Sequence, residues 1–163
     1  MLMLRKFQLA DMPVFLAAID DAKMLMQFAG PAYVFPLTAE QVLMDLQADG
    51  VCVYSMVNDE DEVVGHAQMQ VLLNSVLLRR IVIWDKASRG QGWGKYMVQQ
   101  LLEVAFAMPE VQQVRLNVFD WNTPAIHCYQ RLGFVLSAGP AKPVQVAGET
   151  WQSVSMVCDK PAS

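Results

Sequence analysis

The sequence predicts a single α/β domain spanning residues 1–163, and three patterns along the chain support this prediction. An apolar run at 80–84 precedes a glycine-rich segment and a helical pattern that Pro109 ends. Residues 51–73 alternate with period two around a polar turn, as in a hairpin. A further strand over 114–119 completes the order strand, helix, strand, which implies a right-handed crossover and a parallel pair.

The N-terminal part predicts one strand followed by helices. Residues 2–7 are short and apolar enough for a first strand. Asp11 is then a helix cap, with Pro13 in the first turn. Residues 23–28 either continue this helix or form another turn. Gly30 and the proline after it end the segment.

An aromatic loop separates these helices from the next one. The prolines at both ends of 31–36 argue against a central strand, so Tyr33 either fills the core or forms the wall of a pocket. Thr38, with Gln41 three residues later, predicts a capping box at the start of another helix. Gly50 is placed to close that helix.

The middle of the chain predicts a hairpin that leads into a central strand over 76–84. Within the second hairpin strand, 63–73, Gly65 indicates a bulge or a close approach of two backbones. His66 beside it either faces a ligand or occupies the sheet surface. A turn at Asn74 and Ser75 connects the hairpin to the central strand.

The C-terminal part predicts one more helix and two strands. Thr123 as cap, with a proline at the first helical position, starts a helix that Gly133 stops. Residues 134–136 begin a strand, and 150–158 form another after a loop at 139–148.

Composition limits the class of protein. The chain has 163 residues, of which 54% are hydrophobic, enough for one sizeable core but not for two. No run of eighteen uncharged apolar residues exists, and the first residues lack the order of a secretory signal. The three cysteines, Cys52, Cys128 and Cys158, lie far apart without a Cys-x-x-Cys pair. We therefore expect a cytoplasmic protein with reduced, buried thiols and no metal.

Charge is unevenly distributed along the chain. A net charge of −4 argues against a nucleic-acid-binding surface. Five cations face the single acid Asp85 between positions 79 and 95: Arg79, Arg80, Lys86, Arg89 and Lys95. Residues 1–62 show the opposite bias, which indicates a solvated acidic face or a rim that prefers cations.

The glycine-rich segment has the properties of an anion site. Gly90, Gly92 and Gly94 carry no Cβ atoms that would keep a ligand off the backbone, and glycine tolerates the positive φ angles of a concave loop. Because the first N–H groups of a helix lack internal partners, the amides up to Lys95 can hold a phosphate or pyrophosphate. The alternative is a turn that lets the helix pack closely on the strand.

These residues also match a known family. The pattern Arg89-x-x-Gly92-x-Gly94 after an apolar strand resembles the Q/R-x-x-G-x-G/A signature of the GNAT superfamily of N-acetyltransferases. The segments 117–122, 125–126 and 129–134 resemble the second motif of that family. The resemblance implies a mixed, mostly antiparallel central sheet, splayed between strands 4 and 5, with helices on both faces.

The resemblance also implies site residues for acetyl-CoA as cosubstrate. The residues expected to hold its pyrophosphate are Arg89, Gly90, Gln91, Gly92, Trp93, Gly94 and Lys95. Its pantetheine arm is expected to pair like an extra strand with the backbone of Val82, Ile83 and Trp84. Asn122 matches a residue that helps to bind the cofactor arm, and Tyr129 matches the usual general acid.

The implied reaction is transfer of the acetyl group to a primary amine by direct attack in a ternary complex. Deprotonating a lysine-like amine at pH 7 costs roughly 4 to 5 kcal/mol, so a base or a water chain is needed. Asn117 stands where some relatives carry a glutamate, and 76–84 contains no glutamate. A water relay ordered by His66, Asp85 or Asn117 is our hypothesis. The alternative is a non-catalytic acyl-CoA-binding sensor or regulatory module on the same fold.

The acceptor is less defined. Asn117 disfavours the type of enzyme that modifies peptide amino termini, whereas the acidic N-terminal region favours a small cationic amine. We expect a small-molecule or peptide amine, with neither nucleic acid nor membrane as partner. The acyl-chain preference and the oligomeric state stay open, a homodimer included.

Three rival classes fit poorly. A dinucleotide-binding dehydrogenase needs Gly-x-Gly-x-x-Gly near the start of its domain, and a P-loop needs Gly-Lys-Ser/Thr, which the chain lacks. A hydrolase using Cys128 with His66 or His127 has no evident orienting partner.

Overall fold

The computed structural model describes residues 2–85 and 92–162. Its strands are β1 (Met3–Lys6), β2 (Val51–Val57), β3 (Val63–Val71), β4 (Ser75–Ile83), β5 (Gln113–Phe119), β6 (Val135–Leu136), β7 (Lys142–Val146) and β8 (Glu149–Asp159). Its helices are α1 (Met12–Ala18), α2 (Ala22–Ala29), α3 (Ala39–Gln47), α4 (Trp93–Phe106) and α5 (Thr123–Arg131), with short 3-10 turns η1 (Leu9–Asp11) and η2 (Gly30–Ala32).

The strands form one sheet in the order β1-β2-β3-β4-β5-β8-β6, and β7 pairs with another part of β8. Neighbours are antiparallel except for β4 and β5, which run parallel. Their pairing covers only Ser75–Leu77 against Gln113–Arg115, although both strands continue for several residues. The predicted mixed, mostly antiparallel sheet that splays between strands 4 and 5 is therefore confirmed.

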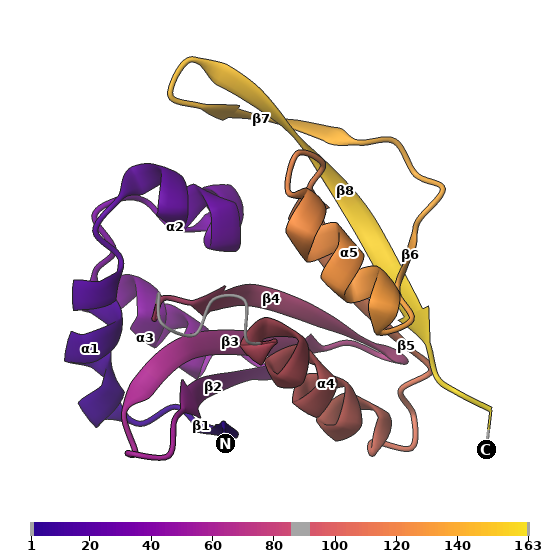
Figure 1. The fold of residues 1–163 in the computed structure, drawn as a ribbon, viewed down its shortest axis with the longest axis horizontal. Helices are drawn as coiled ribbons and strands as arrows, with labels where there is room; N and C mark the ends of the chain where they lie inside the picture. The colour runs from indigo at the N-terminus through magenta and orange to yellow at the C-terminus, as the bar shows by residue number, and fades with distance from the viewer. Residues whose placement is uncertain (1, 86–91, 163) are drawn as a thin grey trace.

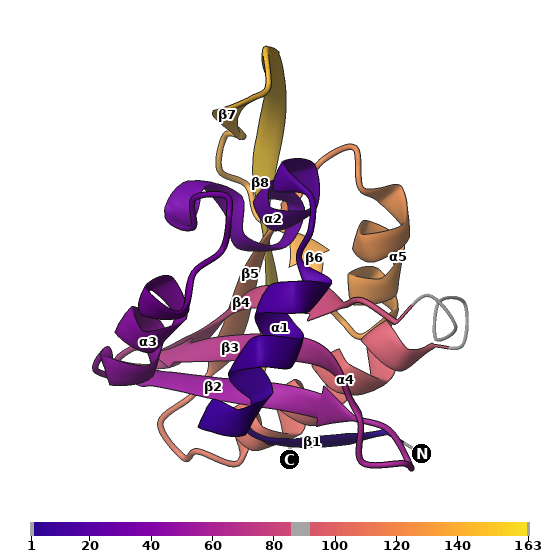
Figure 2. The same ribbon diagram turned by 90° about the vertical axis from the view of Figure 1, so that its left-hand side faces the viewer.

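Helices cover both faces of the sheet, as predicted. Figure 2 shows α1 crossing in front of β2 and β3 with α4 behind them. Each face has its own apolar cluster: Met97 and Leu101 of α4 are fully buried against the strands on one side. Phe15, Leu25 and Val42 bring α1, α2 and α3 together on the other. The 3.6-residue apolar period of each helix thus fixes which of its faces meets the sheet.

The predicted feature at Gly65 is a close approach of two backbones. A Cβ atom at this position would lie 2.8 Å from the carbonyl oxygen of Val82 on β4, a distance that real side chains do not tolerate. The strand pairing also shifts here: Gln68 faces Arg79, whereas His66 faces Val82. Since two steps along β3 match three along β4, β4 carries one extra residue, a β-bulge.

The predicted loop at 139–148 is wrong in its middle, because β7 (Lys142–Val146) pairs with β8. A turn with positive φ at Ala147 (48°) and Gly148 (83°) joins the two strands. Alanine is rare in this conformation, and Pro143 in the strand argued against pairing, so the hairpin left no recognisable signal. Figure 1 shows the hairpin extending away from the rest of the molecule.

The helices at the predicted N-terminal caps exist, but the capping contacts differ. Asp11 precedes α1 without capping it, and its carboxylate instead binds Arg5 at 2.8 and 3.0 Å and Ser55 at 2.8 Å. Thr38 precedes α3, but its side chain accepts no capping hydrogen bond from the backbone of the first turn. The residue that caps α5 is Asn122, one position before the expected Thr123.

Gln41 does not close a capping box. Its side-chain amide binds the backbone of Val34 in both directions, at 2.7 and 3.0 Å, and Thr38 Oγ1 at 3.2 Å. Gln41 therefore fixes the aromatic loop onto α3. Gly50 lies in the turn after α3, which ends at Gln47, so it does not close the helix as expected.

The cysteines are free, but of the three only Cys158 is buried; Cys52 and Cys128 are partly exposed. The expectation of buried thiols is therefore wrong for these two. Within 2–85 and 92–162, no helix has the length and apolarity that a membrane crossing requires.

Candidate active site

A cavity of about 720 Å³ opens where β4 and β5 separate. Its walls come from α2, β4, the N-terminus of α4, β5 and α5. A second cavity of about 240 Å³ lies against α2, η2 and the β7–β8 hairpin, and both are lined by Arg79, Arg80 and Asn117. The splay thus creates a space of the size that small-molecule ligands occupy, with a second space adjoining it.

The end of the glycine-rich segment borders the larger cavity. Gly92, Trp93, Gly94 and Lys95 all line it. Gly92 is left-handed (φ 78°) and precedes α4, whose first hydrogen bond runs from Tyr96 N–H to Gly92 O. A Cβ atom at Gly92 or Gly94 would meet no atom of the described chain within 4 Å, so neither position is crowded by the described residues. Arg89, Gly90 and Gln91 lie outside the described residues.

The edge of β4 that faces the splay also borders this cavity. Val82 and Ile83 line it, while their other edge pairs with His66 and Gly65 of β3. Beyond Leu77, no described strand pairs with the splay side of β4. An extended ligand could therefore pair with this edge, as an added strand does.

Trp84 is placed differently from its two neighbours. It is not among the described residues that line the larger cavity, and its ring stacks on Phe15 at 5.8 Å between centroids. Its N–H donates to the carbonyl oxygen of Val64 at 3.1 Å, so that group is already used within the sheet.

Asn122, which caps α5, and Tyr129 within α5 line the same cavity. Asn122 Oδ1 accepts a hydrogen bond from the Ala125 N–H at 3.4 Å, which leaves its side-chain amide nitrogen for other partners. The Tyr129 ring packs edge-to-face on Phe134 at 5.8 Å. Burial, with a smaller effect of Cys128, raises the pKa of Tyr129 to about 12, so its hydroxyl stays protonated near neutral pH.

A family model described as "Acetyltransferase (GNAT) family" matches residues 20–134, a segment that includes the splay, the end of the glycine-rich segment and α5. The chain belongs to the GNAT acetyltransferase family.

Solved structures of N-acetyltransferases share the fold. Spermidine N-acetyltransferase from Vibrio cholerae, crystallised with CoA and spermine, matches with TM-score 0.80 and 16% identity over 97% of this chain and 95% of that one. A putative phosphinothricin N-acetyltransferase matches with TM-score 0.79 and 18% identity, covering 98% of both chains. The ribosomal-protein-S18-alanine N-acetyltransferase from Escherichia coli matches with TM-score 0.73 and 18% identity over 100% of this chain and 96% of that one.

The three residues proposed to order a water relay differ in burial and in their access to the cavities of this GNAT fold. Asn117 is exposed and lines both cavities. Asp85 follows β4 and is half-buried. His66 is 1% exposed and stacks on Phe15 with ring centroids 4.0 Å apart. Of the three, only Asn117 lines a cavity in the described part of the chain, which makes His66 a core residue rather than a ligand-facing one.

The burial of His66 predicts a pH dependence of stability. Burial, only partly opposed by the charges of Asp45 and Asp11, lowers the pKa of His66 from 6.5 to about 3, so the folded protein holds it neutral. The unfolded chain binds this proton below about pH 6.5, whereas the folded chain does not. The stability that the folded protein has with neutral His66 is therefore fully present above pH 6.5 and is lost as the pH falls toward 3. We expect the free energy of unfolding to fall by on the order of 1 kcal/mol per pH unit.

Urea unfolding between pH 7.5 and 5.0 measures this slope above the range in which the carboxylates titrate. His66→Gln should flatten it, whereas His127→Gln, at an exposed histidine, should leave it unchanged. Equal slopes in the two variants would show that His66 is not the group responsible.

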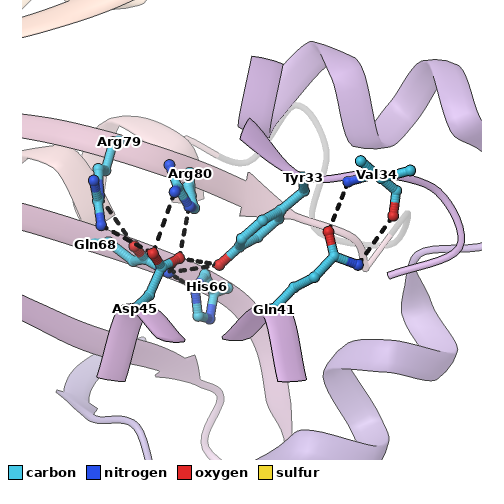
Figure 3. A network of polar contacts seen from close by, with 8 residues as sticks. All are labelled: Tyr33, Val34, Gln41, Asp45, His66, Gln68, Arg79 and Arg80. Carbon is cyan, nitrogen blue, oxygen red and sulfur yellow. Dashed lines mark hydrogen bonds and ion pairs between the residues drawn. The ribbon is translucent and has the colours of Figure 1, made fainter. Parts of the chain in front are cut away.

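A buried polar network anchors α3 to the sheet of this GNAT domain, and Figure 3 shows its members around one carboxylate. Asp45 is 7% exposed and accepts hydrogen bonds from the Tyr33 hydroxyl and from Gln68 Nε2 at 3.1 Å. Arg80 binds it through Nε at 2.8 Å and Nη2 at 3.3 Å, and Arg79 through Nη2 at 3.1 Å. Tyr33 is therefore a core residue with a polar function and not only apolar filling.

The network keeps its carboxylate ionised. Burial alone would raise the pKa of Asp45, but the hydrogen bonds from Tyr33, Arg80 and Gln68 and the charge of Arg80 more than offset it, so the pKa lies below the usual 3.8. Burial and the Asp45 carboxylate raise the pKa of Tyr33 to about 12. At neutral pH the network thus holds one carboxylate, two guanidinium groups and a neutral phenol.

Sequence reasoning missed this network. It interpreted Arg79 and Arg80 as part of the positive charge around the glycine-rich segment, whereas both side chains bind Asp45 on α3. The available signal was two consecutive arginines inside an otherwise apolar strand, since such cations are buried only when paired. Nothing local to the sequence indicated that the partner lies 34 and 35 positions earlier.

Proposed function

We propose that this chain transfers an acetyl group from acetyl-CoA to a primary amine, by direct attack in a ternary complex with Tyr129 as general acid. The observation that supports the proposal is that one cavity is lined by the start of α4, the free edge of β4 and Tyr129. A donor with an anionic end and an extended arm fits these three features in order. Its thioester would then lie beside the phenol.

The anionic end of the donor suits the start of α4. The amides of Trp93, Gly94 and Lys95 precede the first helical hydrogen bond, and the helix dipole adds partial positive charge. Lys95 and Arg131 bring two cationic side chains to the same cavity. We propose the preceding residues Arg89, Gly90 and Gln91 as the rest of this pyrophosphate site. The solved CoA complex of the Vibrio cholerae enzyme, which shares the fold, supports CoA as the ligand.

The arm of the donor suits the free edge of β4. Val82 and Ile83 line the cavity along the splay side of β4, where an extended chain of alternating amides would pair. Trp84, the third residue expected to pair with the arm, already donates its N–H to the Val64 carbonyl of β3, so that group is not available to the arm. Asn122 keeps a side-chain amide for the same arm.

Tyr129 has properties suited to the leaving sulfur. A phenol with a pKa of about 12 is fully protonated at neutral pH and can donate to a thiolate as it forms. Because an ordinary thiol has a pKa near 8.5, complete proton transfer from this phenol is unfavourable until positive charge builds up nearby. The attacking amine supplies that charge as it becomes an ammonium group, and it loses its proton through water at Asn117.

Two measurements test the proposal. Calorimetry should show that CoA binds, and release of free thiol from acetyl-CoA should depend on the presence of an amine from a panel of amines. CoA binding without amine-dependent thiol release would favour the alternative, a non-catalytic acyl-CoA sensor. Absence of binding would overturn both.

A charge placed at the start of α4 tests the pyrophosphate site directly. Gly94→Asp puts a carboxylate in the first turn, where it favours the helix but repels a phosphate. We expect it to weaken CoA binding by about tenfold or more, since each charge-assisted contact contributes that much. Gly139→Asp, at an exposed position that also has open space, is the matched control. Equal affinities for the two variants would refute this location.

A further inference from the structure

Two consecutive arginines of β4 reach the same partner, which a regular strand does not allow. Successive side chains of a strand point to opposite faces, yet Arg79 and Arg80 both bind Asp45. The bulge in β4 makes this geometry possible, and Arg80 adopts φ 52°, a conformation that few residues other than glycine adopt. The chain thus accepts local strain in order to place a second guanidinium beside the first.

The resulting cluster carries an excess of positive charge. Two guanidinium groups face one carboxylate, and the Tyr33 hydroxyl is neutral, so one positive charge is left over. Burial, and next the like charge of Arg80, lower the pKa of Arg79. The charged form of Arg79 is therefore energetically disfavoured at this position. An anion bound beside the pair would remove this cost.

The excess charge faces the cavities. Arg79 and Arg80 line both, and their side chains keep 19% and 11% of their surface exposed. Both use Nη2 on Asp45, and no acceptor among the described residues hydrogen-bonds either Nη1. Within residues 2–85 and 92–162, each guanidinium therefore retains donors for a further partner.

The walls of both cavities lack negative charge. None of their described lining residues is an aspartate or glutamate, and the six positions between the described ranges, 86–91, contain none either. None of the ten acidic residues within 1–62 lines either cavity, and two of them, Asp11 and Asp45, are paired inside the fold. A polyamine, which needs carboxylates along its length, has no such partners here.

We infer that the acceptor carries a carboxylate close to its amine, and that Arg79 and Arg80 bind this carboxylate where the two cavities meet. The inference rests on the proposed acetyl transfer and names its substrate class, a small amino acid or a compound of that type. The larger cavity holds the features assigned to the donor, so the acceptor enters from the smaller one, whose 240 Å³ suits one small molecule. The planar fork of arginine matches a carboxylate with two parallel hydrogen bonds.

Matched pairs of acceptors, assayed with the unmodified protein, test whether the acceptor carries a carboxylate. Each pair is an α-amino acid and its primary amide, assayed by thiol release at equal concentration, with spermidine as the cationic comparison. The amine of the amide is the less basic of the two, so more of it is neutral, which biases the assay against our prediction. We expect kcat/KM to favour the carboxylate by about tenfold or more in the best pair. Calorimetric titration of the CoA complex with the same pairs gives the preference without turnover.

The variant Arg79→Gln then tests whether the arginine pair is the site that binds the carboxylate. This variant keeps the Asp45–Arg80 ion pair and removes the excess charge, so the fold should persist. We expect the carboxylate preference to fall toward one, chiefly through a higher KM for the carboxylate member of each pair. Arg115→Gln removes the same charge from an exposed position on β5 outside both cavities and should keep the preference.

The outcomes separate the inference from the proposed function. Turnover that favours the amides or spermidine would overturn the carboxylate assignment and leave the transferase intact. A carboxylate preference that survives in Arg79→Gln would show that the anion binds elsewhere. CoA binding without turnover of any acceptor would reject the transferase itself, and the calorimetric preference would then decide whether the anion site exists.

Discussion

Replacing Tyr129 by phenylalanine is expected to lower kcat by about 10²–10³-fold, with CoA affinity changed by less than about threefold. The substitution removes only the hydroxyl, while the ring keeps its edge-to-face contact with Phe134. Without the phenol the leaving sulfur departs as an uncompensated thiolate in a half-buried site. The loss therefore appears in the chemical step and not in donor binding.

Thiol release under saturating acetyl-CoA and acceptor measures this effect, and a single-turnover experiment shows whether chemistry limits the rate. Tyr54→Phe is the matched control, because burial also raises the pKa of Tyr54 to about 12, but this residue lines neither cavity. We expect the control to retain kcat within about twofold. A single-turnover rate of Tyr129→Phe within threefold of the natural protein would exclude Tyr129 as general acid.

The sequence predicts well what depends on neighbours along the chain. The glycine spacing places the start of α4, which ends at Phe106, three residues before Pro109. The alternation at 51–73 indicates β2 and β3, because each of these signals is local. The sequence predicts the ends of elements less accurately. Asn122 and Thr123 are both residue types that cap helices, and in the structure Asn122 is the one that caps α5. The hairpin β7–β8 forms despite weak local preference: β7 pairs with residues 149–153 of β8, while residues 153–159 of the same long strand pair with β5.

In the candidate site, too, some residues could be predicted from local motifs and others could not. Gly92, Gly94, Asn122 and Tyr129 belong to local motifs, and the fold brings all four to one cavity. The cluster around Asp45 depends on contacts between distant segments and on a bulge that no residue type in β4 demands. Periodicity describes a regular strand, in which consecutive arginines would point apart, so it could not predict this cluster.

Replacing Asp45 by asparagine is expected to lower the free energy of unfolding by about 3 kcal/mol, because it leaves two largely buried guanidinium groups without a counter-charge. The asparagine keeps the shape, but its NH₂ group is a donor among donors from Tyr33, Arg79 and Arg80. For a domain of this size the melting temperature should fall by roughly 10 °C. Urea unfolding at pH 7.5 measures the change, and Asp49→Asn, at an exposed position after α3, should show almost none.

The double variant Asp45→Asn with Arg79→Gln distinguishes two causes of the lost stability: the missing attraction between Asp45 and the arginines, and the repulsion between Arg79 and Arg80. If the cost comes from unpaired like charges, removing Arg79 should recover part of the stability that Asp45→Asn loses, so the two effects should not add. If the carboxylate matters only as a hydrogen-bond acceptor, the double variant should be less stable than either single one. A loss below about 0.5 kcal/mol for Asp45→Asn would contradict both accounts, because it would mean that the two arginines find sufficient compensation in water.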